Sequence, residues 1–207
     1  MKPSGRRPTT SAVGRVRAQD RRKTAVFFGG VVPASPDEER LAEEVGMALA
    51  GAGFALLHGG YNGLMEAAAR GAAAKGGTVT AVTLAAKHAE WGDFNPHVTD
   101  EVHLPDLGAR LNHYLDAADL LVAMGGGVGT LHELTAALYY AGTIRPVPVW
   151  ITGPTALGLL SFLRREKWLF ETPTRPLGFI SPIGSAAAFA AQLHDLTTGT
   201  DETEVGA

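Results

Sequence analysis

The amino-acid sequence predicts an α/β fold, in which helices cover both faces of a mainly parallel sheet of about seven strands. Short apolar runs alternate with longer amphipathic segments between residues 24 and 196. Several of these apolar runs end in glycine-rich turns that lead directly into helical segments. The length of 207 residues suits one domain with a sizeable core. We therefore expect a single Rossmann-like, doubly wound domain.

Local sequence signals place the elements in order along the chain. The first helix is expected to begin at Ser35-Pro36, because serine is a favoured capping residue and proline is favoured at the first helical position. Residues 85–99 are expected to be irregular. The expected strands are residues 24–28, 54–57, 78–84, 101–104, 118–123, 147–151 and 179–180. The expected helices are residues 36–50, 64–75, 107–117, 131–140, 156–165 and 185–196.

The composition excludes several functional classes. The sequence contains no cysteine, which excludes disulfides, thiolate nucleophiles and cysteine-ligated zinc and leads us to expect a reducing, cytoplasmic location. The apolar runs are too short to span a bilayer, so no membrane partner is expected. The seven histidines are scattered without the spacing of metal ligands, and we predict neither a metal nor another cofactor.

Charge divides the chain into three parts. Residues 1–23 hold eight of the 18 Lys and Arg residues and one of the 21 Asp and Glu residues, and we expect this basic segment to be disordered. The other 10 basic and 20 acidic residues give the rest a net charge of about −10, which disfavours nucleic acid as a partner. The expected domain is residues 24–196, and residues 197–207 form a polar, acidic tail.

The glycine-rich segment at residues 124–130 is the most informative part of the sequence. It follows the apolar run 118–123 and leads into a helical segment. Such a turn presents free backbone N–H groups and the positive end of a helix dipole, which together bind anions. A hydroxyl at Thr130 and a carboxylate at Glu133 follow at once. We therefore predict a phosphate site beside an acid or base, with the phosphate held by Gly126, Gly127, Val128, Gly129 and Thr130.

Three glycine turns follow predicted strands, at Gly29-Gly30, Gly59–Gly63 and Gly125–Gly129. In an open parallel sheet the carboxyl ends of the strands meet at one edge, where ligands bind. The three turns therefore predict a cleft large enough for a nucleotide. The sequence contains neither the G-x-G-x-x-G dinucleotide fingerprint at residues 125–130, where Thr130 replaces the last glycine, nor a P-loop, an H-E-x-x-H or a G-x-S-x-G motif.

Residues 126–133, GGVGTLHE, match the P-G-G-x-G-T-x-x-E signature of the LONELY GUY family after its first residue. These proteins are cytokinin-activating phosphoribohydrolases, which cleave the base from a nucleoside 5′-monophosphate. Residues 58–72, HGGYNGLMEAAARGA, resemble the family's second glycine turn and helix. Arg110 stands 23 residues before Glu133, as the catalytic arginine of the family's M-H-x-R-K motif does. The resemblance extends over roughly residues 24–196.

The sequence departs from this family at several positions. Gly125 replaces the proline of the signature, Gly108 the histidine before the arginine, and Leu111 the lysine after it. Arg110-Leu111-Asn112 and Met124-Gly125 also resemble the related molybdenum-cofactor carrier-like proteins, which share the fold and are regarded as binders.

The resemblance implies a hydrolase that converts AMP or an N6-substituted AMP to free base and ribose 5-phosphate. It implies catalytic roles for Glu133 and Arg110, because a carboxylate can activate water and stabilise an oxocarbenium-like transition state. It also implies a homodimer. The implied nucleoside-binding residues are Gly29, Gly59, Gly60, Asn62, Gly63 and Met65. Two alternatives remain open: a non-catalytic nucleotide or molybdenum-cofactor carrier, and an N-glycosidase acting on a pyrimidine nucleoside monophosphate.

Overall fold

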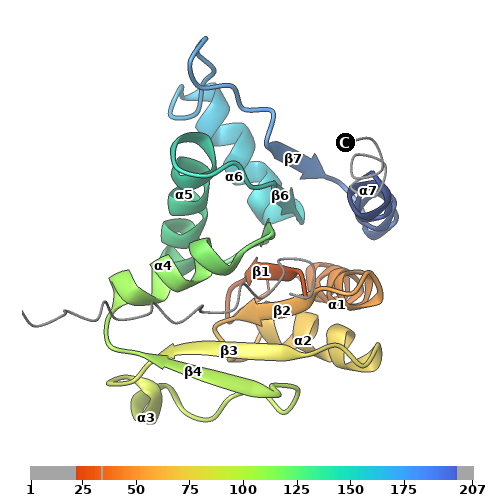
Figure 1. Ribbon diagram of the computed structural model, residues 1–207, viewed down its shortest axis with the longest axis vertical. Helices are drawn as coiled ribbons and strands as arrows, with labels where there is room; N and C mark the ends of the chain where they lie inside the picture. The colour runs from red at the N-terminus through yellow and green to blue at the C-terminus, as the bar shows by residue number, and fades with distance from the viewer. Residues whose placement is uncertain (1–21, 34, 200–207) are drawn as a thin grey trace, which may run out of the picture.

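The computed structural model describes residues 22–33 and 35–199, so the expectations for residues 1–21 and 200–207 lie outside the described residues. Strands and helices alternate along this part of the chain (Figure 1). The strands are β1 (Thr24–Phe28), β2 (Ala55–His58), β3 (Val79–Leu84), β4 (Asp100–Leu104), β5 (Leu120–Ala123), β6 (Val149–Thr152) and β7 (Ile180–Ile183). The helices are α1 (Pro36–Gly51), α2 (Leu64–Ala74), α3 (His88–Trp91), α4 (Leu107–Ala117), α5 (Val128–Thr143), α6 (Pro154–Arg165) and α7 (Ala186–Thr198).

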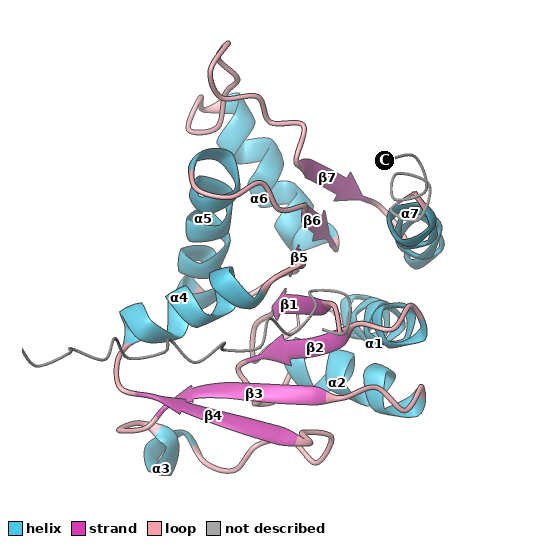
Figure 2. Cartoon of the chain, viewed as in Figure 1, coloured by secondary structure: helices cyan, strands magenta, loops and turns pink. Residues whose placement is uncertain are grey.

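The strands form one seven-stranded sheet in the order β4-β3-β2-β1-β5-β6-β7, and every pairing is parallel. Helices lie on both faces of this sheet (Figure 2). Buried side chains of α1, α2 and α7 pack on one face around Phe27 and Trp150, and those of α4, α5 and α6 pack on the other around Phe28 and Tyr114. The predicted α/β, doubly wound domain with about seven strands is thus confirmed.

The strand order reverses between β1 and β5, and the chain leaves β1 toward β2 on one side and β5 toward β6 on the other. The glycine turns meet at the carboxyl ends of these strands. The amide of Gly30 donates to the carbonyl of Gly125 at 2.8 Å, and the amide of Leu64 donates to the carbonyl of Gly30 at 2.9 Å. The prediction that all three turns share one edge of the sheet is confirmed.

Several element boundaries differ from the expected ones. Helix α5 begins at Val128 rather than at residue 131, because Gly127 is extended and serves as its N-cap. Glu133 therefore lies in the second turn of the helix. The irregular stretch before β4 contains the short helix α3, and α7 continues to Thr198 instead of ending at Leu196. Among the helices of residues 22–33 and 35–199, none combines the length and the apolar composition that a membrane span requires.

Candidate active site

The loop between β5 and α5 is open to solvent where an anion would bind. Residues 126–129 are exposed, whereas the preceding strand and Thr130 are buried. Serine or aspartate side chains accept hydrogen bonds at the amino ends of α1, α4 and α7, but the N-cap of α5 is Gly127, which has no side chain to do so. The first N–H groups of α5 therefore have no side-chain capping partner, as an anion site at a helix terminus requires.

The glycines of this loop differ in what surrounds them. A Cβ atom at Gly126 would overlap the side chain of Thr130, so packing itself requires glycine there. A Cβ atom at Gly127 or Gly129 would meet nothing within 4 Å, and neither residue has a positive φ. The fold therefore does not demand glycine at these two positions, and the open space around a Cβ atom there leaves room for a ligand to approach the backbone.

Glu133 and Arg110 form an ion pair beside this loop. Nη2 of Arg110 lies 3.5 Å from Oε1 of Glu133, and their side chains are only 14% and 15% exposed. Burial raises the pKa of Glu133 to about 7, and the positive charge of Arg110 opposes that rise. A carboxyl group with a pKa near neutrality suits a general base. The structure therefore brings together the two residues for which catalytic roles are predicted.

Arg110 is held by groups from β3 and from its own helix. Its Nε donates to the carbonyl of Val82 at 3.0 Å and to the hydroxyl of Tyr114 at 3.2 Å. The Tyr114 hydroxyl in turn donates to the same Val82 carbonyl at 3.1 Å. The sequence analysis did not identify Tyr114, although its spacing of four residues from Arg110 places both side chains on one face of α4.

The second glycine turn lies against this arginine. A Cβ atom at Gly59 would lie 3.0 Å from Nη2 of Arg110 and 3.0 Å from Sδ of Met65, which places both side chains beside the turn. Gly60 and Gly63 have φ values of +84° and +72°, a conformation that favours glycine. Asn62 is exposed, and Gly29 is buried against the side chains of Phe27 and Leu64. Of the predicted nucleoside-binding residues, Gly59 thus adjoins Arg110 and has Met65 beside it, and Gly29 has a packing role.

Side chains beneath the turn hold it in place. Nδ2 of Asn95 donates to the carbonyls of Gly60 and Tyr61 at 2.9 and 3.0 Å. The amide of Gly60 donates to Nδ1 of His58 at 2.8 Å, and burial lowers the pKa of this histidine to about 3. His58 is therefore neutral at physiological pH and supports the turn as a hydrogen-bond acceptor.

A buried glutamate supports the loop between β5 and α5 from behind. Ser35 caps α1 as predicted, its hydroxyl accepting from the amide of Glu38 at 3.2 Å. The Glu38 side chain is buried and accepts from the hydroxyl of Thr155 at 3.3 Å. A Cβ atom at Gly125 would lie 2.7 Å from Oε1 of Glu38, so this carboxylate fills the space behind the loop. Sequence reasoning treated Glu38 as part of a helix start and missed this contact across the fold.

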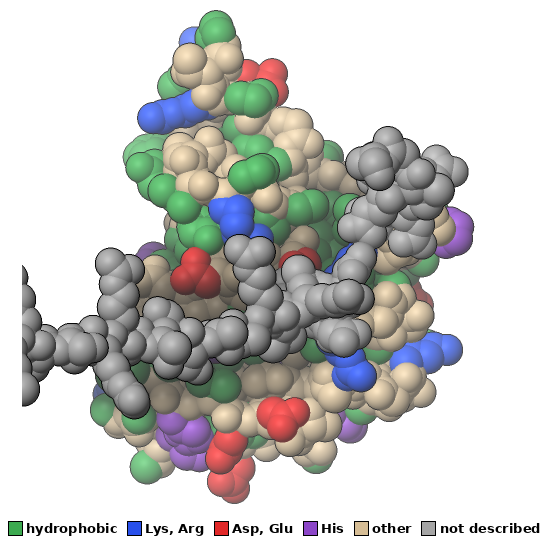
Figure 3. Space-filling view, viewed as in Figure 1, with side chains coloured by type: hydrophobic (Ala, Val, Ile, Leu, Met, Phe, Trp, Pro, Cys, Tyr) green, Lys and Arg blue, Asp and Glu red, His purple; other side chains and the backbone are tan. Residues whose placement is uncertain are grey.

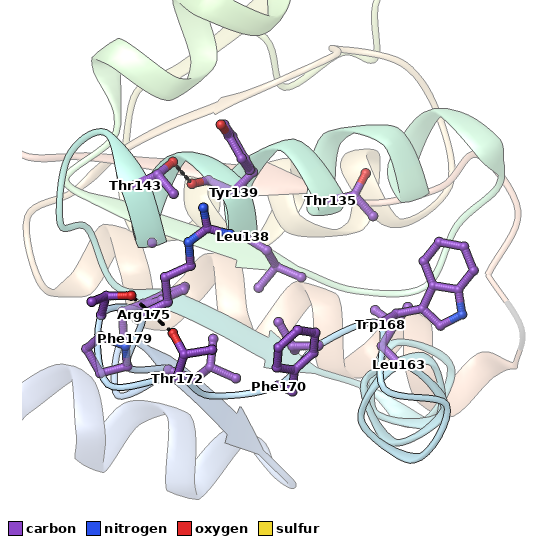
Figure 4. Close-up of a pocket in the computed structure, with 15 residues that line it drawn as sticks. Thr135, Leu138, Tyr139, Thr143, Leu163, Trp168, Phe170, Thr172, Arg175 and Phe179 are labelled. Atoms are coloured by element: carbon purple, nitrogen blue, oxygen red, sulfur yellow. Dashed lines mark hydrogen bonds between the residues drawn. The ribbon is translucent and has the colours of Figure 1, made fainter.

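A cavity of about 700 Å³ lies on the outer side of α5, away from the ion pair (Figure 4). Its wall includes Tyr139 of α5, Leu163 of α6, and Trp168, Phe170 and Phe179 of the segment that leads to β7. Hydrophobic side chains gather on the part of the surface formed by α5 and α6 (Figure 3). This apolar cavity does not include Arg110 or Glu133, so it is a separate feature from the candidate active site. Within residues 22–33 and 35–199, no cluster of three or more His, Asp or Glu side chains is arranged to hold a metal ion.

Residues 22–152, more than half of the chain, match the family described as the SLOG cluster4 family. The chain belongs to this family. An uncharacterized protein from Archaeoglobus fulgidus is 41% identical over 113 residues, which cover 53% of this chain and 72% of that protein. The cytokinin riboside 5′-monophosphate phosphoribohydrolase of Mycobacterium tuberculosis is 35% identical over 114 residues, which cover 54% of this chain and 59% of that enzyme. The latter match thus spans less than two thirds of the mycobacterial enzyme.

Solved structures share the SLOG fold at lower identity. The molybdenum cofactor binding protein of Rippkaea orientalis has a TM-score of 0.67 and 23% identity, with 86% of this chain and 98% of that chain covered. DNA processing protein A of Helicobacter pylori, which binds single-stranded DNA, has a TM-score of 0.54 and 12% identity, with 84% and 81% covered. At these identities the likeness shows the fold alone. The predicted resemblance to LONELY GUY enzymes and to molybdenum-cofactor carrier proteins is confirmed.

Proposed function

We propose that this protein is a phosphoribohydrolase, which cleaves the N-glycosidic bond of a nucleoside 5′-monophosphate. The observation that carries the proposal is the partly buried ion pair between Glu133 and Arg110. Glu133 lies on α5, whose uncapped amino end adjoins an open glycine loop, and Arg110 reaches it from α4. The loop would bind the 5′-phosphate through the amides of residues 127–130 and the hydroxyl of Thr130. Glu133, in the second turn of the same helix, then lies beside the ribose.

The reaction needs a base, an electrostatic partner and a water molecule. As the bond from the anomeric carbon to the base nitrogen breaks, its electron pair leaves with the base and the ribose gains positive charge. The Glu133 carboxylate stabilises that charge and takes a proton from the attacking water. Arg110 orients the carboxylate and donates to the ribose or to the departing base. The proton that Glu133 takes from the water passes to the base nitrogen, so the products are ribose 5-phosphate and the neutral free base.

The position of the second glycine turn supports one direction for the proposed substrate. The loop after β5 and the turn after β2 are separated by β1, and therefore by two strand spacings, or about 10 Å. A nucleotide with its phosphate at the first loop would cross Glu133 and Arg110 and bring its base to Gly59 and Met65. We propose AMP or an N6-substituted AMP as the substrate, because the mycobacterial relative is named for action on a cytokinin riboside 5′-monophosphate.

A second candidate is a nucleotide or molybdenum-cofactor carrier without turnover. Gly108 and Leu111 favour it, because they replace two residues of the arginine motif of the phosphoribohydrolases, and so does the fold shared with a molybdenum cofactor binding protein. Incubation with AMP, CMP and an N6-substituted AMP, followed by assay of free base and ribose 5-phosphate, separates these functions. Release of base from CMP alone would instead indicate a pyrimidine nucleotide N-glycosidase. Binding without release would indicate a carrier.

The Glu133→Gln variant tests the assigned base directly. We expect turnover to fall by about 100-fold or more, because glutamine cannot take a proton from water. AMP binding, measured by calorimetry, should persist because the glycine loop is unchanged. An unaltered rate would remove Glu133 from the mechanism.

We also propose that two copies associate through the outer face of α5 and the segment after α6. Tyr139, Trp168 and Phe170 are 64%, 77% and 62% exposed there, which is unusual for large apolar side chains gathered on one surface. Because α5 begins at the phosphate loop, such an interface would adjoin the active site. Sedimentation equilibrium of the unaltered protein and of Trp168→Glu should give a dimer and a monomer, respectively. A monomeric unaltered protein would contradict this association.

A further inference from the structure

We propose that Tyr114 is a positioning residue, which acts through Arg110 to aim the guanidinium at Glu133. Its effect on turnover rests on the phosphoribohydrolase activity proposed above, whereas its effect on the ion pair does not. The tyrosine is buried below the site, on the side of Arg110 that faces the sheet, and has no direct access to a ligand in the glycine loop.

Three groups form a closed triangle of hydrogen bonds. The single Nε–H of Arg110 is shared between the Val82 carbonyl at 3.0 Å and the Tyr114 hydroxyl at 3.2 Å, and the hydroxyl donates its own proton to that carbonyl at 3.1 Å. Burial raises the pKa of Tyr114, so the hydroxyl stays protonated and able to donate. The guanidinium carbon also lies 5.2 Å from the centre of the tyrosine ring.

Because the guanidinium is planar, this triangle of hydrogen bonds orients the whole group. Fixing the direction of Nε–H fixes the plane of the whole group and with it the directions of both terminal amines. One of those amines, Nη2, is the atom that lies 3.5 Å from Glu133 and next to Gly59. An arginine side chain held only through its terminal amines would not have the plane of its guanidinium fixed in this way.

The hydroxyl has no packing reason to be present. The Tyr114 ring packs edge-on against Phe28, with ring centres 5.7 Å apart, and a phenylalanine would fill the same space. A buried hydroxyl is unfavourable unless its hydrogen bonds are satisfied, and here both of its bonds serve the arginine and the strand end that holds it. The hydroxyl therefore has a role in orienting Arg110 that the core does not require.

The end of β3 connects this triangle to the second glycine turn. Thr83, the residue after Val82, has its hydroxyl 2.6 Å from the hydroxyl of Tyr61. The charged and ionisable groups that act on Tyr114 are Arg110 of its own helix, Glu133 of α5 and Tyr61 of the turn after β2. Both tyrosines are anchored at consecutive residues of one strand end, which places the arginine and the proposed nucleoside side of the site in one rigid frame.

The test is the Tyr114→Phe variant, assayed with AMP across a range of pH. We expect kcat to fall about fivefold to tenfold, which is the effect of losing one oriented hydrogen bond, with KM changed less than twofold. Arg110 lowers the pKa of Glu133 in the unaltered protein. A less well-aimed guanidinium lowers it less, so the acid limb of the kcat profile should move to higher pH. Unchanged kcat and an unchanged profile overturn the proposal.

Two comparisons separate positioning from mere structural support. Tyr140→Phe removes a matched hydroxyl, which lies 2.8 Å from Asp116 and accepts from Nε of Arg145, and should leave kcat unchanged. In an Arg110→Lys background no Nε–H remains, so Tyr114→Phe should have little further effect on kcat. Fully additive losses in that double variant would assign Tyr114 a role independent of Arg110 and overturn the proposal.

Two further measurements need no turnover, and they distinguish failure of this inference from failure of the proposed activity. Carbon-detected NMR can titrate the Glu133 carboxyl, assigned by its loss in Glu133→Gln, and its pKa should be higher in Tyr114→Phe. In the unaltered protein the Nε proton of Arg110 should exchange with water at least tenfold more slowly than that of an exposed arginine. Exchange at the exposed rate would overturn the proposal even if Tyr114→Phe failed to fold.

Discussion

Arg110 and Arg145 each place a guanidinium carbon against a tyrosine ring, 5.2 Å from the centre of the Tyr114 ring and 5.7 Å from that of Tyr140. Their terminal amines differ. Nη2 of Arg145 donates to the carbonyls of Leu115 at 2.8 Å and Ala118 at 2.7 Å, at the end of α4. Nη2 of Arg110 faces a carboxylate at the edge of the sheet instead.

The difference separates an arginine that serves the fold from one that serves a ligand. The last carbonyls of a helix lack partners within the helix, and Arg145 supplies them with hydrogen bonds and a favourable charge. Arg110 uses only its Nε to anchor itself, so its terminal amines are available to the site. Proximity to a tyrosine ring does not distinguish the two residues, but the partners of their terminal amines do.

Replacing each arginine by alanine should give the largest difference between the two residues, in turnover for one and in stability for the other. We expect Arg110→Ala to reduce turnover by about 100-fold with a small change in thermal stability, because it removes charge from the reacting centre. Arg145→Ala should lower the free energy of unfolding by about 1–3 kcal/mol, because helix carbonyls lose their partner, and leave turnover of the folded protein unchanged. Steady-state kinetics and denaturant titration measure the two effects. The reverse pattern would exchange the roles of the two residues.

The pH dependence of the free energy of unfolding should reveal the raised pKa of Glu133 in the ion pair. The pKa of Glu133 is raised from 4.5 to about 7. Between these values the folded protein binds more protons than the unfolded chain, so this group's contribution to stability is present below pH 4.5 and is lost as the pH rises through 7. The full effect is roughly 3 kcal/mol.

Denaturant titrations at pH 5 and pH 8 measure this contribution. The free energy of unfolding of the unaltered protein should fall between these values relative to that of Glu133→Gln, which has no carboxyl group to titrate. Parallel behaviour of the two proteins would show that Glu133 has an ordinary pKa. Turnover should rise over the same interval, since the proposed base acts as the carboxylate.

Alanine substitutions at two neighbouring glycines of the loop should have the smallest effects, one on the stability of the fold and the other on ligand binding. Gly126→Ala should destabilise the protein by about 1–3 kcal/mol, because its methyl group overlaps Thr130. Gly127→Ala should change the free energy of unfolding by less than about 1 kcal/mol, because the space around it is empty. We expect its methyl group to weaken AMP binding several-fold by calorimetry. Undiminished AMP affinity would place the phosphate elsewhere.

The sequence was sufficient to predict the sheet, its glycine turns and the choice of Arg110 and Glu133 as candidate residues of one site. Strand and helix signals are local in the sequence. The two site residues were identified because their spacing of 23 residues matches that of the family's motifs. The support of Arg110 was not predictable in the same way. Val82 contributes a backbone carbonyl from 28 residues away, so no side-chain type marks it in the sequence. Likewise, the buried contact of Glu38 with Thr155 joins residues 117 positions apart.

The start of α5 was missed for a different reason. Gly127, Val128 and Gly129 have little intrinsic helix propensity, so the helix was expected to begin after them at residue 131. Tertiary packing of Thr130 and Leu134 into the layer below draws the first turn into the helix. Because the helix starts earlier, Glu133 lies in its second turn instead of its first. It is therefore farther from the amino end, where the anion is expected.

Gly30 uses both of its backbone groups to tie the turns after β1, β2 and β5 to one another. Inserting a residue before it would shift its N–H and C=O out of register and separate the two halves of the crevice. Extra chain can be accommodated after Gly30, where Val31 and Val32 are exposed on the way to α1. Extra chain is therefore expected to be tolerated after Val31 and not before Gly30, whose two hydrogen bonds hold the turns together.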